Sequence, residues 1–249
     1  CRNLPANQRT KGIIWGTVGA IVLRVILIAF AVALLLIYAL ASVLNMGIPH
    51  SGAKYPASTL HPIELMKDFW RANRLLWRDA EGGLSLGVTT IFWGLGATLQ
   101  FVVLKWSADI LGLPLEHAAY LQAAVAVGVV AGAGIAGRWI ALRNAKRVLP
   151  AGVLMGLLIV GSAHVTQLST ALVVLLVMGA VGGILVVPLN ALLQHRGFVL
   201  LTAGRSIAVQ GFNENLSVLC MLGIYAGLVA ADISIISLMT LFGLCTAVT

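Results

Sequence analysis

Long apolar stretches separated by short polar segments dominate the chain. A helix needs about 20 mostly apolar residues to cross the hydrocarbon core of a bilayer, and seven stretches meet or approach that length. They run approximately over residues 12–44, 84–106, 118–140, 149–166, 169–194, 204–230 and 233–249. Because lipid cannot satisfy the open edge of a sheet, this pattern predicts an all-α membrane protein.

Composition supports the same class. Of the 249 residues, 60% are hydrophobic and 10% are charged, and the formal net charge is +8. In a water-soluble chain such a charge would suggest nucleic acid as a partner. Here the basic residues gather between the apolar stretches, where they orient membrane proteins and attract anionic headgroups. We therefore expect membrane lipids as partners and no nucleic acid.

The distribution of basic residues also predicts an orientation. The segment 45–83 carries five basic residues, whereas the turn 107–117 carries Asp109 and Glu116 but no Lys or Arg. Since Lys and Arg are enriched in cytoplasmic loops, the segment 45–83 is expected in the cytoplasm. The six apolar stretches from residue 84 onward then alternate with one consistent topology.

The first apolar stretch does not fit this topology. A single crossing would place Arg2, Arg9 and Lys11 outside, against the positive-inside tendency. As one helix its roughly 33 residues would extend about 50 Å, too long for one upright crossing and too short for two. We expect an irregularity near residues 30–38. Arg24 is either a polar lining residue or a residue displaced from its native partner.

The segment 45–83 contains a predicted helix of its own. His61 and Pro62 suit an N-cap and a first turn, and apolar residues recur at helical spacing at Leu65, Phe69, Ala72 and Leu76, with basic residues on the other side. This pattern is typical of an amphipathic helix on the inner leaflet, joining two halves of a larger transporter. The alternative is an ordinary solvated connector.

Four polar residues share one face of the stretch 204–230. Gln210, Asn213, Glu214 and Ser217 stand at i, i+3, i+4 and i+7. A polar stripe of this kind is expected to face a cavity rather than lipid. Glu214 is the one acidic residue deep within a predicted span. It could meet a cationic headgroup or take up a proton, and the alternative is a structural carboxyl hydrogen-bonded to a neighbour.

Two other stretches add polar candidates. Asn190 and Gln194 are four residues apart, beyond Pro188, which can kink or break the helix, and Gln100 lies in the middle of the stretch 84–106. The substrate-binding candidates are therefore Glu214, Asn213, Gln210, Asn190, Gln194 and Gln100. Glycines in the stretch 118–140, such as Gly128 and Gly132, predict close helix packing.

Metalloprotease and phosphate-loop motifs are missing from the sequence. There is no HExxH or GxxxxGK[ST] pattern, and the five histidines lie near span ends or in loops. We expect no enzyme, no catalytic residue, no metal site and no cofactor.

From about residue 38 to the end, an ordered series of motifs resembles the lysophospholipid transporter (LplT) family of the major facilitator superfamily. The motifs are Ile91-Phe92-Trp93-Gly94, Ala97-Thr98-Leu99, Pro150-Ala151-Gly152, Gly182-Gly183, Val186-Val187-Pro188-Leu189-Asn190-Ala191-Leu192-Leu193-Gln194, Ile207-Ala208-Val209-Gln210, Glu214-Asn215 and Met221-Leu222-Gly223-Ile224-Tyr225.

The resemblance implies that the first stretch ends as the sixth helix of a twelve-helix fold and that the others are helices seven to twelve. It implies a multi-pass protein of the bacterial inner membrane that moves lysophosphatidylethanolamine-type lipids from the outer to the inner leaflet. An acyltransferase partner would then re-acylate them. The alternatives are a small-molecule or drug exporter of the same superfamily, or a structural fragment that transports nothing.

Residues 2–36 resemble another family, TerC. The similarity is carried by Leu4-Pro5, Gln8-Arg9, Gly12, Gly16, Gly19-Ala20 and Arg24. The acidic membrane residues of that family are missing from this piece, so we do not expect its metal export. We expect a TerC-like fragment over 1–37, the end of helix six and a cytoplasmic linker over 38–83, and a six-helix transporter half over 84–249. A join between two unrelated genes, in a chain that is a fragment at both ends, would explain the charge conflict.

Overall fold

The computed structural model of this protein describes residues 6–47 and 61–248. Within these residues the secondary structure is helical, without strands, as the hydropathy pattern predicts. The chain divides into two compact units, residues 1–58 and residues 59–249, and each is described by itself.

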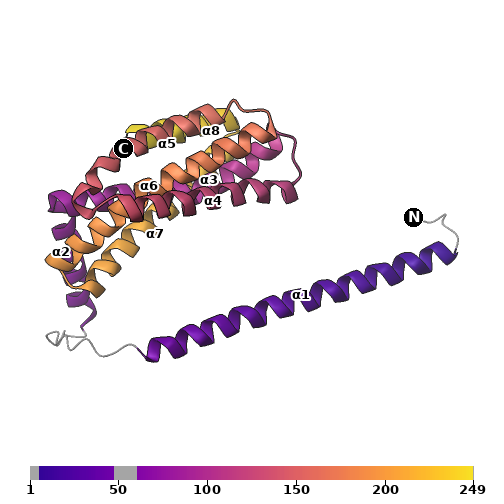
Figure 1. Cartoon of the computed structure of the whole chain (residues 1–249), viewed down its shortest axis with the longest axis horizontal. Helices are drawn as coiled ribbons and strands as arrows, with labels where there is room; N and C mark the ends of the chain where they lie inside the picture. Colours follow the sequence, from indigo (N-terminus) through magenta and orange to yellow (C-terminus); the bar gives the residue numbers. More distant parts are fainter. Residues whose placement is uncertain (1–5, 48–60, 249) are drawn as a thin grey trace. The chain divides into compact units, whose positions relative to one another are not determined.

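The first unit contains one long helix. Helix α1 runs without interruption over Ala6–Met46 (Figure 1). Its apolar window, Leu27–Met46, is 20 residues long and sufficient to cross a membrane. Arg24 lies just before this window, so a crossing over Leu27–Met46 does not place its charge at the centre of the bilayer. The expected irregularity near residues 30–38 does not interrupt the helix, because residues 21–46 contain neither Gly nor Pro.

The second unit is a bundle that follows the predicted stretches closely. Its helices are α2 (Pro62–Arg78), α3 (Ala80–Asp109), α4 (Leu115–Trp139), the short 3₁₀ helix η1 (Leu142–Val148), α5 (Leu149–Ser162), α6 (Leu168–Leu200), α7 (Ala203–Ala230) and α8 (Ile235–Val248). Among the described residues, six segments are long and apolar enough to span a membrane, including Leu27–Met46 of α1, and α8 is a shorter apolar helix.

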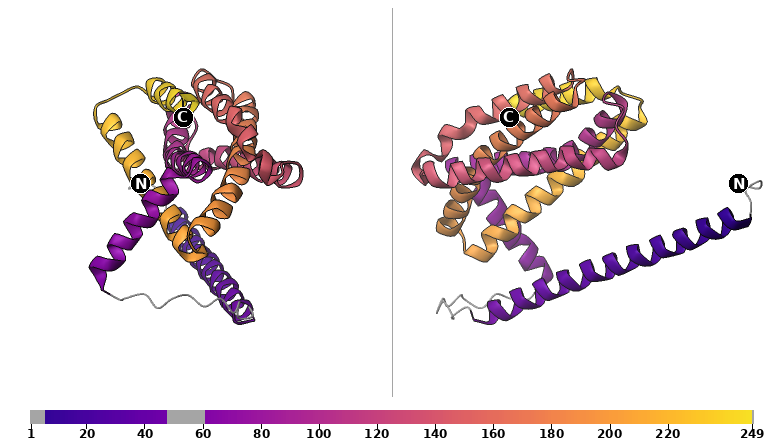
Figure 2. Two further views of the ribbon diagram at one scale, coloured as in Figure 1. Left: turned by 90° about the vertical axis from the view of Figure 1, so that its left-hand side faces the viewer. Right: turned by 45° about the vertical axis from the view of Figure 1, so that its right-hand side comes forward.

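Helices that are distant in sequence pair within this bundle. The most extensive contacts join α4 to α6, α3 to α7 and α5 to α8, while α6 also packs on α3 and α5 (Figure 2). The main core contains fully buried side chains from several of these helices, among them Trp106, Leu121, Ile159, Leu238 and Met239. Burial of such side chains fixes how the helices sit against one another.

Glycines allow α4 and α6 to approach until their backbones touch. A methyl group added at Gly128 or Gly132 of α4 would meet the backbone of Leu176 or Ala180 of α6. In return, Gly179 and Gly183 of α6 lie against the backbone of α4. The close packing predicted for Gly128 and Gly132 is therefore confirmed.

Pro188 does not break α6. The residue is buried inside a helix that continues over Leu168–Leu200. Leu185 and Leu189 on either side are buried against Val148 of η1, and this packing supports the helix through the proline. The sequence left open a helix broken at Pro188, and the structure does not show such a break.

Helix α2 belongs to the bundle. It begins at Pro62 with His61 at the N-cap position, as predicted. Ala72 and Leu76 are buried in a cluster with Leu86, Leu193 and Val209, and Phe69 is half-buried against it. Leu65, expected on the same face, is exposed. Because α2 packs on α3, α6 and α7, it is more than a solvated connector.

Candidate functional site

A polar cluster joins α6 to α7. The side-chain amide of Gln210 donates one hydrogen bond to Asn190 Oδ1 and another to Glu214 Oε1, both at 2.8 Å. All three side chains are half-buried. Since both hydrogens of the Gln210 amide are used, this side chain presents its carbonyl oxygen to any further partner. The cluster combines a carboxylate with two amides at a partly accessible place, a composition suited to binding an ammonium group.

Asn213, one residue away on α7, contacts a different helix. Its oxygen accepts a hydrogen bond from Trp77 Nε1 at 3.1 Å, and its Nδ2 donates to Asn73 Oδ1 and to the Val209 carbonyl, each at 2.8 Å. Asn213 and Asn73 are both buried. The polar groups of Asn213 are thus engaged in attaching α2 to α7, which positions the neighbouring cluster rather than exposing Asn213 to a ligand.

The remaining predicted residues lie apart from the cluster. Gln194 on α6 and Gln100 on α3 are exposed, and the backbone carbonyl of Gln100 accepts a hydrogen bond from Gln122 Nε2 at 3.0 Å. Ser217 lies directly against Gly94, where α3 and α7 approach closely. The structure therefore brings together three of the six candidate residues: Gln210, Asn190 and Glu214.

An ion-pair network closes one end of the bundle. Asp79 is the N-cap of α3 and accepts a hydrogen bond from the Gly82 amide at 2.7 Å. Its two carboxylate oxygens also pair with the guanidinium of Arg196, with 2.9 Å between Arg196 Nε and Oδ1. Glu81 extends the network, with its carboxylate 2.7 Å from Lys146 Nζ and 3.9 Å from Arg196.

The network shifts the ionisation of Asp79. The hydrogen bonds from Arg196 and the Gly82 amide outweigh the effect of burial and lower the pKa of Asp79 to about 2. The carboxylate therefore stays charged at every ordinary pH. The contacts connect the junction of α2 and α3 to the end of α6 and to η1.

Sequence reasoning did not identify Asn73 or the Asp79–Arg196 pair. A signal for Asn73 was available, because it shares a helix face with Phe69, Ala72 and Leu76, and a polar residue within an apolar face usually has a buried partner. No comparable signal marks Asp79 and Arg196, which are 117 positions apart. Lys105, by contrast, pairs with Asp109 one turn onward at 2.9 Å, at the end of α3.

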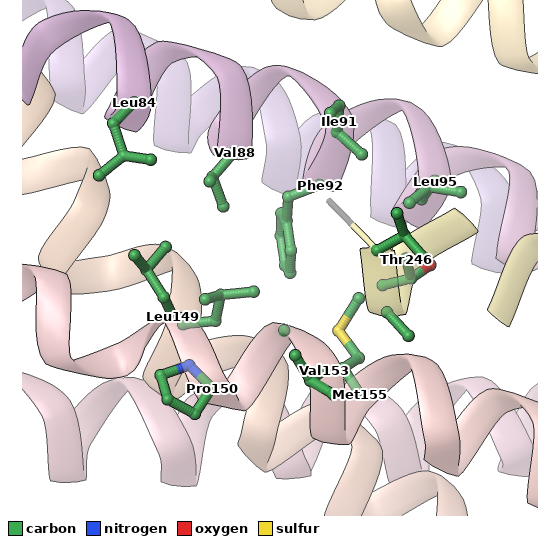
Figure 3. A pocket seen from close by; sticks show the side chains of 14 residues that line it. Leu84, Val88, Ile91, Phe92, Leu95, Leu149, Pro150, Val153, Met155 and Thr246 are labelled. Carbon is green, nitrogen blue, oxygen red and sulfur yellow. The ribbon is translucent and has the colours of Figure 1, made fainter. Parts of the chain in front are cut away.

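A second feature is an apolar pocket of about 340 Å³ between α3, α5 and α8. Figure 3 shows Val88 and Phe92 of α3 facing Val153 and Met155 of α5, with Thr246 of α8 at one side. Its lining includes none of the six candidate residues. The polar cluster and this hydrocarbon-like pocket therefore offer separate environments within one bundle.

Taken together, the apolar helices and the polar groups held between them define an all-α membrane protein. The chain is 42% identical over 202 residues to Lysophospholipid transporter LplT of Pectobacterium carotovorum subsp. carotovorum (strain PC1). The aligned region covers 80% of this chain and 49% of the relative. It is also 42% identical over 204 residues to Lysophospholipid transporter LplT of Yersinia enterocolitica serotype O:8, covering 81% of this chain and 50% of that protein. The resemblance inferred from the sequence motifs is confirmed.

The chain thus spans about half the length of the curated relatives it matches. Residues 1–48 match the integral membrane protein TerC family, which confirms the second resemblance and extends it beyond residue 36. No solved structure matches the chain. The relatives are named as transporters, and their names indicate transport rather than catalysis.

Proposed function

We propose that residues 84–249 are the C-terminal six-helix half of a lysophospholipid transporter with the major facilitator fold. The observation that carries this proposal is the Gln210–Asn190–Glu214 cluster, which lies half-buried between α6 and α7. The names of the relatives supply the substrate class, since each is called a lysophospholipid transporter.

The cluster suits the headgroup of lysophosphatidylethanolamine. The carboxylate of Glu214 attracts an ammonium group, and this attraction is stronger at a half-buried position than in bulk water. The Gln210 carbonyl and the Asn190 amide add polar contacts beside it. Exposed Gln194 and Gln100 would contact the headgroup on its way to or from the cluster, whereas Asn213 would act by positioning α7.

Orientation follows from the charges at the ends of the helices. Arg138, Arg143, Arg196 and Arg205 belong to the same side as the basic helix α2, and this side would lie in the cytoplasm. The protein would then be a multi-pass protein of the bacterial inner membrane. It would carry lysolipid from the outer to the inner leaflet, where an acyltransferase re-acylates it. Rocking of two six-helix halves would expose the cluster to each leaflet in turn.

The N-terminal region has a separate origin in this proposal. Residues 1–37 would be a TerC-like fragment, residues 38–83 the end of helix six with the linker, and residues 84–249 the transporter half. The TerC match over residues 1–48 supports a join between two genes, and because it extends past residue 37 it favours a join near the end of helix α1 at Met46. Sequencing the gene across codons 30–60 in an independent isolate tests this, and a TerC-free coding sequence there would refute the join.

Lysolipid binding by the purified chain tests the site. The chain is placed in nanodiscs of neutral lipid and titrated with fluorescent lysophosphatidylethanolamine. The substitution Glu214→Gln removes the charge and is expected to weaken binding about tenfold, the usual scale for one charge-assisted hydrogen bond. Glu116→Gln, at the exposed start of α4, is the control and should bind as the unmodified chain does.

Three further measurements separate the alternatives. Lysophosphatidylglycerol, which lacks the ammonium group, should bind more weakly than lysophosphatidylethanolamine and should be insensitive to Glu214→Gln. Preference for a soluble amphipathic cation over lysolipid would instead indicate a drug exporter. A hybrid carrying the N-terminal half of the Pectobacterium relative, placed in liposomes, should move labelled lysolipid between leaflets. If it does not, or if Glu214→Gln leaves lysolipid binding unchanged, the proposed site is wrong.

A further inference from the structure

A separate pocket lies between α2 and the turn that joins α6 to α7. Its volume is about 310 Å³, and its lining is both charged and apolar. Asp68 and Arg71 contribute from α2, Thr202 and Arg205 from the start of α7, and Leu75 and Leu201 supply apolar surface. None of these residues belongs to the cluster around Glu214, which is nine residues farther along α7, or roughly 13 Å.

The pocket carries an excess of positive charge. Asp68 lies between two guanidinium groups, with 2.9 Å from its Oδ1 to Arg71 and 3.5 Å from its Oδ2 to Arg205. Two cations against one carboxylate leave a net charge of +1. Both arginines are well exposed, at 79% and 51% of their side-chain surface, so each has further N–H groups directed to the surroundings. The first turn of α7 adds partial positive charge at the same place.

The helices that form the pocket set its position along the membrane normal. One candidate membrane span ends at Leu200 and the next begins at Ala203, and the pocket is built around the turn between them. Residues at such a turn lie at the level of lipid headgroups. Beside it, α2 exposes Ile63, Met66 and Trp70, which are suited to the boundary between headgroups and acyl chains.

We propose that Arg71 and Arg205 form a site for the phosphate group of an anionic phospholipid resident in the adjacent leaflet. Arginine matches the geometry of phosphate oxygens, and two guanidiniums about one carboxylate can rearrange to hold a phosphate between them. The apolar lining, which includes Leu75 and Leu201, would contact the first methylenes of the acyl chains. A bound lipid would tie α2 to the start of α7. This inference needs only the membrane location of the bundle, so it stands or fails separately from lysolipid transport.

The test measures lipid binding to the complete chain by native mass spectrometry in a neutral detergent. The probes are phosphatidylglycerol and, as a lipid without phosphate, diacylglycerol. The double substitution Arg71→Gln and Arg205→Gln should weaken phosphatidylglycerol binding about fivefold for each arginine, or roughly 25-fold together. Arg138→Gln with Arg143→Gln, which removes two exposed charges outside the pocket, is the matched control and should change binding less than twofold.

Asp68→Asn provides a result of the opposite sign. Removing the carboxylate raises the charge of the pocket, so phosphatidylglycerol should bind several-fold more tightly. This variant also decides the matter if the double arginine variant does not fold. The proposal is overturned if Asp68→Asn weakens binding, if both double variants behave alike, or if diacylglycerol binds as well as phosphatidylglycerol. If millimolar inorganic phosphate displaces the lipid, the pocket binds phosphate groups in general, and the proposal that its occupant is a phospholipid is wrong.

Discussion

The ion pair between Asp79 and Arg196 allows a quantitative test of what holds the bundle together at one end. Asp79→Asn removes the carboxylate charge but keeps an oxygen that can accept the Gly82 amide, since Asn is as good an N-cap as Asp. The variant therefore isolates the ion pair from the helix cap. Asp79→Ala removes both and should cost about 1 kcal/mol more.

The magnitude follows from the ionisation of Asp79. Its pKa is lowered from 3.8 to about 2. A shift of this size corresponds to at most about 2.5 kcal/mol, and screening by water at a pair on the edge of the bundle reduces it to about 1 kcal/mol. Because the folded pKa is the lower one, this stabilisation is fully present above about pH 4 and is lost as the pH falls through about 2.

Thermal unfolding in detergent, followed by tryptophan fluorescence, measures the effect. At pH 7, Asp79→Asn should lower the unfolding midpoint by about 2–4 °C, and the deficit should shrink as the pH falls below 4. The control is Asp109→Asn, whose partner Lys105 is also 2.9 Å away but in a more exposed pair, with an expected effect under about 0.5 kcal/mol. The reasoning is refuted if Asp79→Asn matches the unmodified chain at pH 7, or if its deficit persists unchanged at pH 2.

Two other substitutions test the packing of the bundle. Gly132→Ala should lower the unfolding free energy by about 1–3 kcal/mol because its methyl group meets the backbone of Ala180. The control Gly134→Ala, which has open space around it, should be neutral or slightly stabilising. Equal effects of the two substitutions in thermal unfolding would contradict the close packing of α4 and α6. Asn73→Ala should lower the unfolding free energy by about 1–2 kcal/mol because it leaves the buried Asn213 amide short of a partner. By the same assay, the control Asn215→Ala, on an exposed side chain, should cost less than about 0.5 kcal/mol. A larger loss of stability for Asn215→Ala than for Asn73→Ala would show that Asn213 does not hold α2.

The helices of this protein are strongly encoded in local sequence. Length and hydropathy predict the stretches from residue 84 onward because a bilayer imposes one requirement on each of them separately. The ends differ by a few residues, most clearly for α6, which continues from the predicted end at 194 to Leu200. Hydropathy declines there through Gln194, His195 and Arg196, but polar residues do not end a helix, and α6 continues to its C-cap at Leu201.

The candidate site was only partly predictable. Helical spacing places Gln210, Asn213 and Glu214 on one face, and in the structure Gln210 and Glu214 share one cluster. Spacing within one helix does not reveal which neighbour each residue meets. Gln210 reaches Asn190 of α6 as well as Glu214 of its own helix, whereas Asn213, at the edge of the same face, reaches α2. Those partners are 20 and 140 positions distant, and tertiary packing alone brings them together.

The attachment of α2 to Asn213 has a consequence for movement of α7. Asn213 and Glu214 are consecutive residues of one continuous helix, so a twist of α7 that redirects the Glu214 carboxylate also displaces the Asn213 amide. Such a twist must either break the contacts with Asn73 and Trp77 or drag α2 along. Helix α2 therefore moves with every twist of α7 that leaves these hydrogen bonds intact.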